Sequence, residues 1–136
     1  MSKIELKTNP VWQDLTNILE TIDSEALIKE HLELCEYKVC GYWDERDIYH
    51  EEISLPRTLQ ADLASGYIGL ANVDRFLQLK FSLKAADLAD RSQKIGEVVL
   101  IYDENLDFVD ENWMIDIDFL EDVVGFHLAE PNLPTY

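Results

Sequence analysis

The sequence predicts an α+β domain in which an N-terminal helix pair packs on a mainly antiparallel β-sheet. Two observations carry this prediction. Apolar residues recur at helical spacing before Cys35, whereas several later segments alternate apolar and polar residues. A period of two is typical of a half-buried strand, and a period near 3.6 is typical of an amphipathic helix. Helices followed by mostly adjacent strands indicate an α+β arrangement rather than alternating β-α units.

Length and composition indicate one domain. A chain of 136 residues, 47% of them hydrophobic, is long enough to build one core and too short for two. We expect a single domain over residues 1–128 and a loose C-terminal tail over 129–136. The sequence has no apolar signal core and no apolar run long enough to span a bilayer. With only two cysteines, which favours reduced thiols, a cytoplasmic location is expected.

The charge is strongly negative and unevenly distributed. The chain carries 28 acidic and 11 basic residues, a net charge of −17. No Lys or Arg follows Lys94, although residues 95–136 contain eleven acids. Such a balance argues against nucleic acid or an anionic membrane as a direct partner, and it favours a basic protein or a cation.

Two helices are expected first. Thr8 or Asn9 is suited to cap a helix that has Pro10 in its first turn. Asp23-Ser24-Glu25 ends this helix and begins the next, and the short connection predicts an antiparallel pair. The apolar faces consist of Val11, Leu15, Ile18, Leu19 and Ile22 in the first helix and Leu27, Ile28, His31, Leu32 and Cys35 in the second.

The middle of the chain is expected to alternate strands and short helices. Residues 37–43 and 48–55 predict two paired strands around the turn 44–47. Pro56 is expected to begin a short helix with Leu59 and Leu63 on one side and Gly66 at its end.

Residues 77–84 alternate Leu or Phe with polar residues and predict a strand. A helix over 72–94 is the competing interpretation, because Leu and Lys are good helix formers. Residues 84–94 are expected to be helical on propensity.

Residues 95–120 predict a β-hairpin around which the other elements are arranged. Residues 98–102 are an unbroken apolar run, typical of a strand buried on both faces or nearly so. Turn-forming residues follow at 103–107, and residues 113–119 then alternate strictly. The inward face is expected to hold Trp113, Ile115, Ile117 and Phe119, and the outward face Met114, Asp116, Asp118 and Leu120.

No metal site is expected, although two patterns were candidates. Asp103, Asn105 and Asp107 match the first ligands of a calcium-binding EF-hand loop, but Phe108 and Met114 stand where Gly and Glu are required. A zinc set of His31, Cys35, Cys40 and His50 lacks the usual close pairing of ligands.

The sequence also predicts no enzyme and no cofactor. No histidine lies in a recognisable catalytic motif, and no nucleophile elbow, P-loop or dinucleotide fingerprint is present. With so many carboxylates, a pair spaced for glycoside hydrolysis carries no information. The tryptophans Trp12, Trp43 and Trp113 are expected in the core, with Trp43 as a conceivable exposed anchor at a strand end.

The run from Val98 to Ile117, V-V-L-I-Y-D-E-N-L-D-F-V-D-E-N-W-M-I-D-I, with its unrelieved acidity, resembles bacterial immunity proteins, including those of contact-dependent growth inhibition systems. That resemblance implies binding to a cognate toxin domain, often a basic nuclease, whose active site is blocked. The residues expected to bind such a partner are Asp103, Glu104, Asp107, Asp110, Glu111, Asp116, Asp118 and Trp43.

Two alternatives stay open. One is a nucleic-acid mimic that inhibits another basic protein, which surface carboxylates spaced like phosphates would favour. The other is a small enzyme or metal-binding protein, which a cleft with converging carboxylates and a histidine would favour. The bland alternative is that the high charge serves only solubility, whereas a partner that neutralises the acidic patch is the simplest reason for it.

Overall fold

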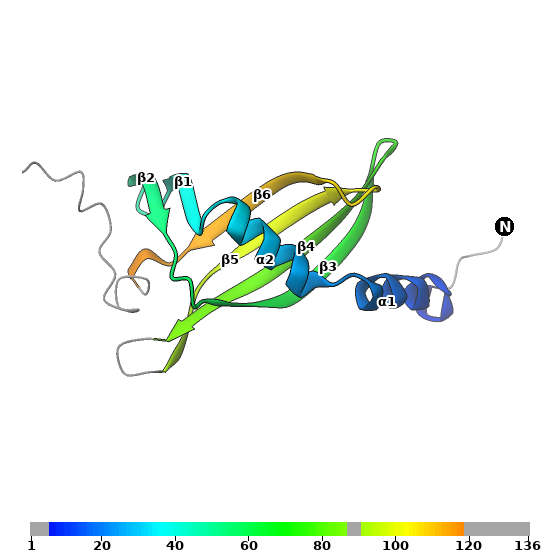
Figure 1. Cartoon of the computed structure of the whole chain (residues 1–136). Helices are drawn as coiled ribbons and strands as arrows, with labels where there is room; N and C mark the ends of the chain where they lie inside the picture. Colours follow the sequence, from blue (N-terminus) through cyan, green and yellow to red (C-terminus); the bar gives the residue numbers. More distant parts are fainter. Residues whose placement is uncertain (1–5, 87–90, 119–136) are drawn as a thin grey trace, which may run out of the picture.

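A four-stranded antiparallel sheet forms the body of the molecule, and two helices follow one another along one face of it. The computed structural model describes residues 6–86 and 91–118. The strand order is β3-β4-β5-β6, and a separate two-stranded sheet, β1-β2, stands at one end (Figure 1). The α+β class with an antiparallel sheet is confirmed.

Element bounds follow the chain. A 3-10 turn, Leu6–Thr8, precedes the helices. Pro10 is the N-cap residue of α1, and the side chain of Asn9 before it accepts a hydrogen bond from the Val11 N–H at 2.9 Å. Asp23 caps α2 through the Ala26 N–H at 3.0 Å. The elements are α1 Val11–Thr21, α2 Ser24–Leu34, β1 Lys38–Trp43, β2 Tyr49–Ser54, β3 Gln60–Ala71, β4 Asp74–Ala86, β5 Ser92–Asp103 and β6 Phe108–Ile115.

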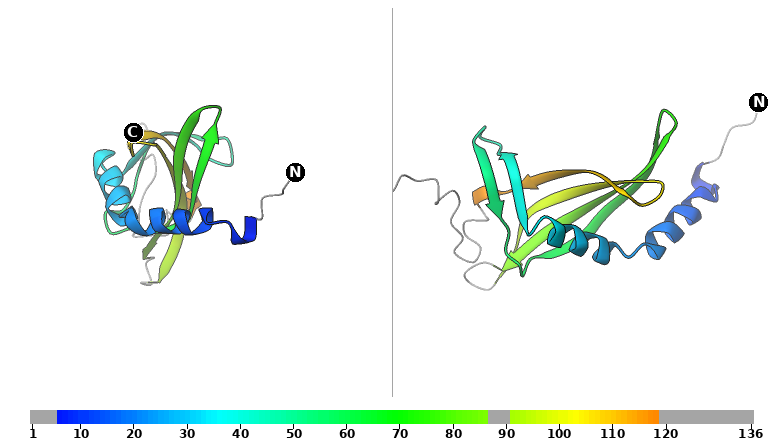
Figure 2. Two further views of the ribbon diagram at one scale, coloured as in Figure 1. Left: turned by 90° about the vertical axis from the view of Figure 1, so that its right-hand side faces the viewer. Right: turned by 45° about the horizontal axis from the view of Figure 1, so that its top comes forward.

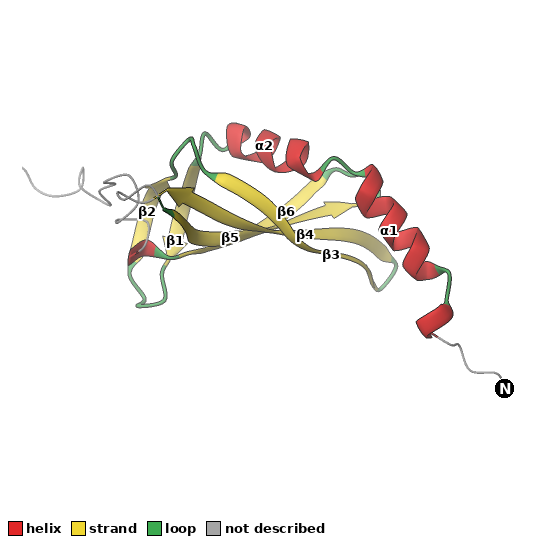
Figure 3. Cartoon of the chain, turned by 90° about the horizontal axis from the view of Figure 1, so that it is seen from below, coloured by secondary structure: helices red, strands yellow, loops and turns green. Residues whose placement is uncertain are grey.

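The two helices do not form the expected antiparallel pair. They run in the same general direction along an arc (Figure 3), because the connection contains one extended residue, Ile22, with ψ 126°, and does not reverse the chain. α2 buries Ile28 and Leu32, as its apolar face predicts, but no residue of α1 is buried. Figure 2 shows that α1 continues beyond the sheet.

The core lies between the inner face of the sheet and α2. Alternate residues of β4 are buried, from Leu77 to Ala85, and the β1–β2 hairpin adds Val39 and Ile53. On β5 the burial alternates as well: Val98 and Leu100 are buried, whereas Val99 is partly exposed. Residues 98–102, predicted to be buried on both faces or nearly so, are thus fully buried on one face and partly buried on the other, because within the described residues helices cover only one face of β5.

Two predicted helices are strands. The residues after Pro56 form β3, whose pairing with β4 overrides the helical spacing of Leu59 and Leu63. Two positions of this strand, Gly66 and Gly69, leave no room for a larger residue. A Cβ on Gly66 would lie 2.7 Å from a Leu19 side-chain carbon, and one on Gly69 would lie 2.4 Å from the Phe76 ring. These glycines admit a helix residue on one face and an aromatic ring from β4 on the other.

The strand over 77–84 is confirmed within β4, and the competing helix over 72–94 is wrong. The described parts of 84–94 are the end of β4 and the start of β5, so the helix predicted there is also wrong; residues 87–90 lie outside the described ranges. Long-range pairing supplies backbone hydrogen bonds on both sides of β4 and outweighs the helix propensity of Lys and Ala.

The predicted hairpin of β5 and β6 is confirmed, with different bounds. β6 begins at Phe108 and ends at Ile115 rather than running over 113–119. Ile115 and Ile117 are buried and Trp113 is partly buried, so the inward face is correct as far as the description goes. Phe119, Leu120, the remainder of the expected domain up to 128 and the tail 129–136 lie outside the described residues.

Candidate functional site

The turn between β5 and β6 is built on one carboxylate. Asp103 Oδ1 accepts hydrogen bonds from the backbone N–H groups of Asn105 at 2.8 Å and Asp107 at 3.0 Å. Leu106 takes a positive φ of 64° to close the turn. Asp103 is therefore a structural residue, whereas the side chain of Asp107 is exposed.

Glu104 extends from the same turn toward the β3–β4 hairpin. The Arg75 guanidinium donates to its carboxylate at 3.4 Å, and both side chains are largely exposed. An ion pair this exposed adds little stability, because water screens it.

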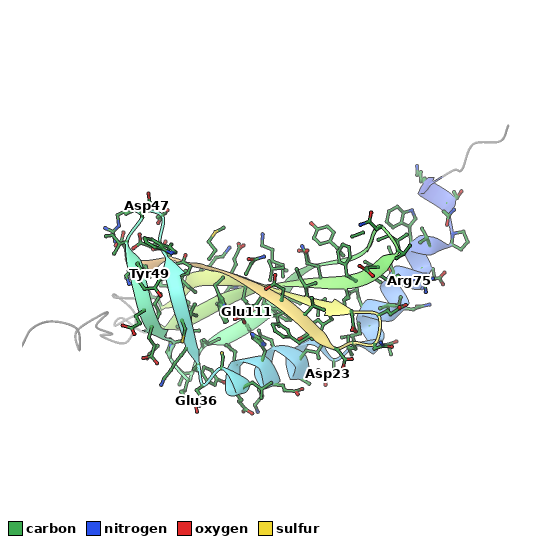
Figure 4. The ribbon with its side chains drawn as sticks, turned by 90° about the horizontal axis from the view of Figure 1, so that it is seen from above. Asp23, Glu36, Asp47, Tyr49, Arg75 and Glu111 are labelled. Atoms are coloured by element: carbon green, nitrogen blue, oxygen red, sulfur yellow. The ribbon has the colours of Figure 1, made fainter. Side chains whose placement is uncertain are left out.

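The first residues of β6 direct their charges to opposite sides. Asp110 Oδ1 accepts a hydrogen bond from the Glu111 N–H at 2.8 Å. The Glu111 carboxylate contacts His31 Nε2 of α2, on the helix-covered face; Figure 4 labels Glu111 at this strand. Glu111 is thus engaged with α2, while Asp110 is exposed.

The far end of β6 carries the second acidic group. Asp118 accepts a hydrogen bond from the Arg46 guanidinium at 3.3 Å, and the Asp116 N–H donates to the Ile95 carbonyl at 2.9 Å. The rise of ~3.3 Å per strand residue places this group roughly 25 Å from the turn acids. The acidic residues form two separate groups at the two ends of β6 rather than one patch.

A cleft lies at this second end, between the β1–β2 hairpin and the sheet. Its volume is about 580 Å³, within the range of ligand pockets in proteins. The lining residues are Tyr42, Trp43, Asp44, Glu45, Lys94, Gly96, Glu97, Trp113, Met114, Ile115 and Asp116.

Two large apolar side chains are exposed at the cleft. Trp43 is 61% exposed and Met114 is 65% exposed. The Trp43 ring packs beside Tyr49 across the β1–β2 pair, with ring centroids 4.9 Å apart. The expectation that Trp43 lies in the core is wrong, because β1 has no helix over that side in the described residues. Trp12 is also exposed, whereas Trp113 packs against the core.

Tyr42 joins the hairpin to β6 at the base of the cleft. Its hydroxyl oxygen accepts a hydrogen bond from the Ile115 N–H at 2.8 Å and donates to the Ile115 carbonyl at 3.3 Å. One side chain from the β1–β2 sheet thus bonds both the N–H and the carbonyl of Ile115, and this holds the β1–β2 hairpin against β6 at the cleft.

Asp44 holds the hairpin turn from inside. One oxygen accepts from the N–H groups of Arg46 at 2.9 Å and Ile48 at 3.0 Å, and the other bonds His50 Nε2 at 2.8 Å. The hydrogen bond with His50, followed by that with the Ile48 N–H, lowers the pKa of Asp44 below its usual value. This carboxylate is committed to the turn, although it reaches the cleft wall.

Glu97 and two lysines form the polar wall on the sheet side. Lys80 Nζ lies 3.0 Å from Glu97 and Lys94 Nζ lies 2.5 Å from it. Hydrogen bonds from Lys94 and Lys80 lower the pKa of Glu97. This cluster of two lysines and one glutamate carries a net charge of +1. The carboxylates of Asp44, Glu45 and Asp116 also line the cleft, so the lining as a whole is acidic.

The structure disperses the set of candidate zinc ligands. His31 bonds Glu111, His50 bonds Asp44, and the Cys35 thiol donates to the Leu32 carbonyl at 3.4 Å. Among the described residues, no group of three or more His, Cys, Asp or Glu side chains is arranged to hold a metal ion. The segments flanking the EF-hand-like turn are strands, in agreement with the sequence. Within the described ranges, the helices are too short or too polar to cross a bilayer.

Sequence reasoning missed three parts of the site. It placed Met114 only as an outward residue, and it did not pair His31 with Glu111 or His50 with Asp44. Such pairs join distant segments, so no local pattern reveals them. The Asp44 turn had a signal, because Asp followed by polar residues favours a turn closed by its own side chain.

Comparison with models of protein families, with curated proteins and with solved structures found no match to this chain.

Proposed function

We propose that this protein binds a basic protein domain and inhibits it, as a cytoplasmic immunity protein neutralises a toxin. The observation that carries the proposal is the Trp43–Tyr49 pair, exposed beside a cleft that is bordered by Glu45 and Asp116. Exposed aromatic residues at a preformed cleft are typical anchors of protein interfaces.

The chemistry of the cleft fits a Lys or Arg side chain. A guanidinium or ammonium placed over the Trp43 ring gains a cation–π interaction, which is strongest on tryptophan. The methylene stem of the same side chain would pack against Met114, and the carboxylates of Glu45 or Asp116 would pair with its charge. A toxin nuclease must present such side chains to phosphate, so blocking them excludes its substrate.

The acidic residues at the β5–β6 turn have a different role in this proposal. At ~3.3 Å per residue, Asp110 lies about 13 Å from Met114 of the cleft and Asp107, in the same turn as Glu104, about 23 Å from it, so one partner side chain does not span the two places. Their charge would steer a basic partner during its approach, raising the association rate toward ~10⁸ M⁻¹s⁻¹ at low salt. Asp103 and Glu111 are assigned no direct contact, because hydrogen bonds inside the fold occupy them.

The geometry favours this inhibitor over the nucleic-acid mimic. Residues on one face of a strand recur every ~6.6 Å, close to the spacing of phosphates along one strand. On the outward face of β6 that row is Asp110, Asn112 and Met114, followed by Asp116. Two of the four positions carry no charge, so β6 does not present a continuous row of phosphate-like groups.

An enzyme remains the other alternative, since Asp44 lines the cleft and bonds His50. Both oxygens of Asp44 are used inside the hairpin, and the cleft lining includes no Ser, Thr or Cys among the described residues. That arrangement supports a structural role for the pair. The expectation that the chain has no catalytic activity stays a prediction.

The test is a comparison of three baits in extract from the source cell: wild type, Trp43→Ala and the control Leu34→Ala. Leu34 is 76% exposed on α2, away from the cleft. The proposal requires a basic protein that wild type and Leu34→Ala retain and Trp43→Ala loses. That protein, once purified, must bind the wild type directly and lose activity on binding. A retained protein that is acidic, or that Trp43→Ala holds equally well, would refute the proposal.

A further inference from the structure

The second half of β3, residues 65–71, carries apolar side chains and lacks the features that usually protect an edge strand. β3 is twelve residues long, and its partner in the sheet is β4. Protected edges carry charges, prolines or strong bulges that prevent pairing with another chain. After the register shift near Ala64, residues 65–71 contain no charged residue and no proline.

The side chains of this edge are exposed although they are large and apolar. Leu70 is 72% exposed, Ile68 is 42% exposed and Val73, in the adjoining turn, is 89% exposed. Ile68 and Leu70 share the inner face with Gly66, because alternate residues of a strand share a face. Gly66 contacts Leu19 of α1, so these residues continue the surface on which α1 begins to pack.

The helix α1 presents a matching apolar surface. Val11 is 40% exposed, Ile18 is 39% exposed and no residue of the helix is buried. Its remaining positions are mostly uncharged polar residues, with Asp14 and Glu20 as the only acids and no base. Figure 2 shows α1 and the β3–β4 hairpin diverging at this end of the molecule. A surface this poor in charge is typical of the centre of a protein interface.

Charge decides which occupant fits. A basic partner is attracted to β6 and to the cleft, whereas segment 65–71 and α1 offer it at most two carboxylates. A second copy carries −17 itself, so it can approach closely only where both surfaces are nearly neutral. An edge strand is also self-complementary, since antiparallel pairing of a segment with its own copy has two-fold symmetry.

We propose that two copies of this chain associate through β3 and α1, with segment 65–71 pairing antiparallel to the same segment of the second copy. The eleven residues of α1 and the seven of segment 65–71 approach the ~20–30 residues per side of a stable interface. The apolar face of α1 covers the inner face of the extended sheet across the two-fold axis. The dimer leaves the cleft and the β5–β6 turn free on each copy.

Sedimentation equilibrium over a wide range of protein concentration tests this proposal, with Leu70→Lys and Met114→Lys as a matched pair. Both positions lie in edge strands at similar exposure, 72% and 65%, and both changes add one positive charge. Wild type and Met114→Lys are expected at twice the 15.8 kDa of the chain, and Leu70→Lys at the mass of the monomer. Equal behaviour of the two variants, or a monomeric wild type at every concentration, would overturn the proposal.

Two further measurements keep the test decisive. If Leu70→Lys does not fold, Val11→Lys on α1 replaces it and must dissociate the dimer as well. Hydrogen exchange of the amides of 65–71 must slow as the concentration of the wild type rises. Added salt must strengthen the dimer by screening the like charges, whereas it weakens binding of a basic partner, so the two proposals fail independently.

Discussion

The two edge strands of the sheet, β6 and β3, differ in their charge and in the side chains that bond their backbone. At β6 the backbone is occupied by side chains: Asp110 accepts from the Glu111 N–H, and the Tyr42 hydroxyl takes both the N–H and the carbonyl of Ile115. At β3 the segment 65–71 has neither a charge nor a proline. The comparison indicates that the acidic residues are not spread evenly over the sheet, since the β6 edge carries them and segment 65–71 of the β3 edge has none. It also separates two tasks, attraction of a basic partner and association with a like-charged copy.

The largest expected difference between the edges concerns stability. Ile117→Ala, just beyond β6, removes a side chain that is 5% exposed, and it should cost roughly 2–5 kcal/mol of unfolding free energy. Leu70→Ala on β3 removes one that is 72% exposed, and it should cost less than about 0.5 kcal/mol in the monomer. Urea unfolding at low protein concentration measures both. Equal losses would mean that the inward register of β6 is wrong.

A smaller effect is expected from the hydroxyl that closes the β6 edge. Tyr42→Phe leaves the buried N–H and carbonyl of Ile115 without their partner, which should cost about 1–3 kcal/mol. Tyr67→Phe on β3 is the control, because that side chain is 57% exposed and water replaces its contacts. Thermal melts of both variants beside wild type give the difference; a loss no greater for Tyr42→Phe than for Tyr67→Phe would exclude the bridging role.

The hairpin beside β6 should also respond to acid. Asp44 has a pKa below its ordinary 3.8 in the folded state, chiefly because of the hydrogen bond with His50. Its contribution is complete above that ordinary pKa and is lost as the pH falls through the lower, folded value, since the unfolded chain binds the proton first. Acidification also relieves repulsion among the other carboxylates, so the quantity to compare is the difference between proteins.

Asp44→Asn removes the titration and keeps an oxygen for the turn. The difference in unfolding free energy between wild type and Asp44→Asn should therefore shrink as the pH falls below about 4. Asp47→Asn in the same turn, where the side chain is exposed, serves as the control. A difference that stays constant through the acid range would show that the Asp44 carboxylate is not stabilised by the fold.

The smallest stability effect is expected at the acidic turn. Asp107→Asn with Asp110→Asn should leave stability unchanged or raise it by a few tenths of a kcal/mol, because like charges are removed. Asn at 110 retains the acceptor that binds the Glu111 N–H. Urea unfolding detects the sign, and a loss above about 1 kcal/mol would mean that these carboxylates hold the fold.

Sequence patterns predicted the elements whose signals are local. The alternation of Leu77, Leu79, Phe81 and Leu83 fixed β4, and Asp23 marked the start of α2. The pattern failed at β3, where good helix formers follow Pro56 and only Gly66 and Gly69 hint at close packing across strands. Long-range pairing decides such a segment, and a single sequence does not display its partners.

The candidate site divides in the same way. The acidity of the β5–β6 hairpin is visible in composition, and the sequence placed Asp107 and Asp110 on the surface correctly. It did not separate the carboxylates into two groups. Carboxylates that are only a few residues apart in the sequence lie far apart in space, because β6 is extended. The cleft depends on Tyr42 reaching Ile115 from another sheet, a contact 73 residues apart in sequence.

The central claim is that acidic charge on β6 steers a basic partner whose side chain the Trp43 cleft then holds. The most direct measurement is the association and dissociation rates of the purified partner against salt concentration. Four proteins are compared: wild type, Asp107→Asn with Asp110→Asn, Trp43→Ala, and the charge-matched control Asp14→Asn with Glu20→Gln on α1. The turn variant should associate more slowly with a flatter salt dependence, and Trp43→Ala should dissociate faster at an unchanged association rate. Identical salt slopes for wild type and the turn variant, or an unchanged dissociation rate for Trp43→Ala, would contradict the account.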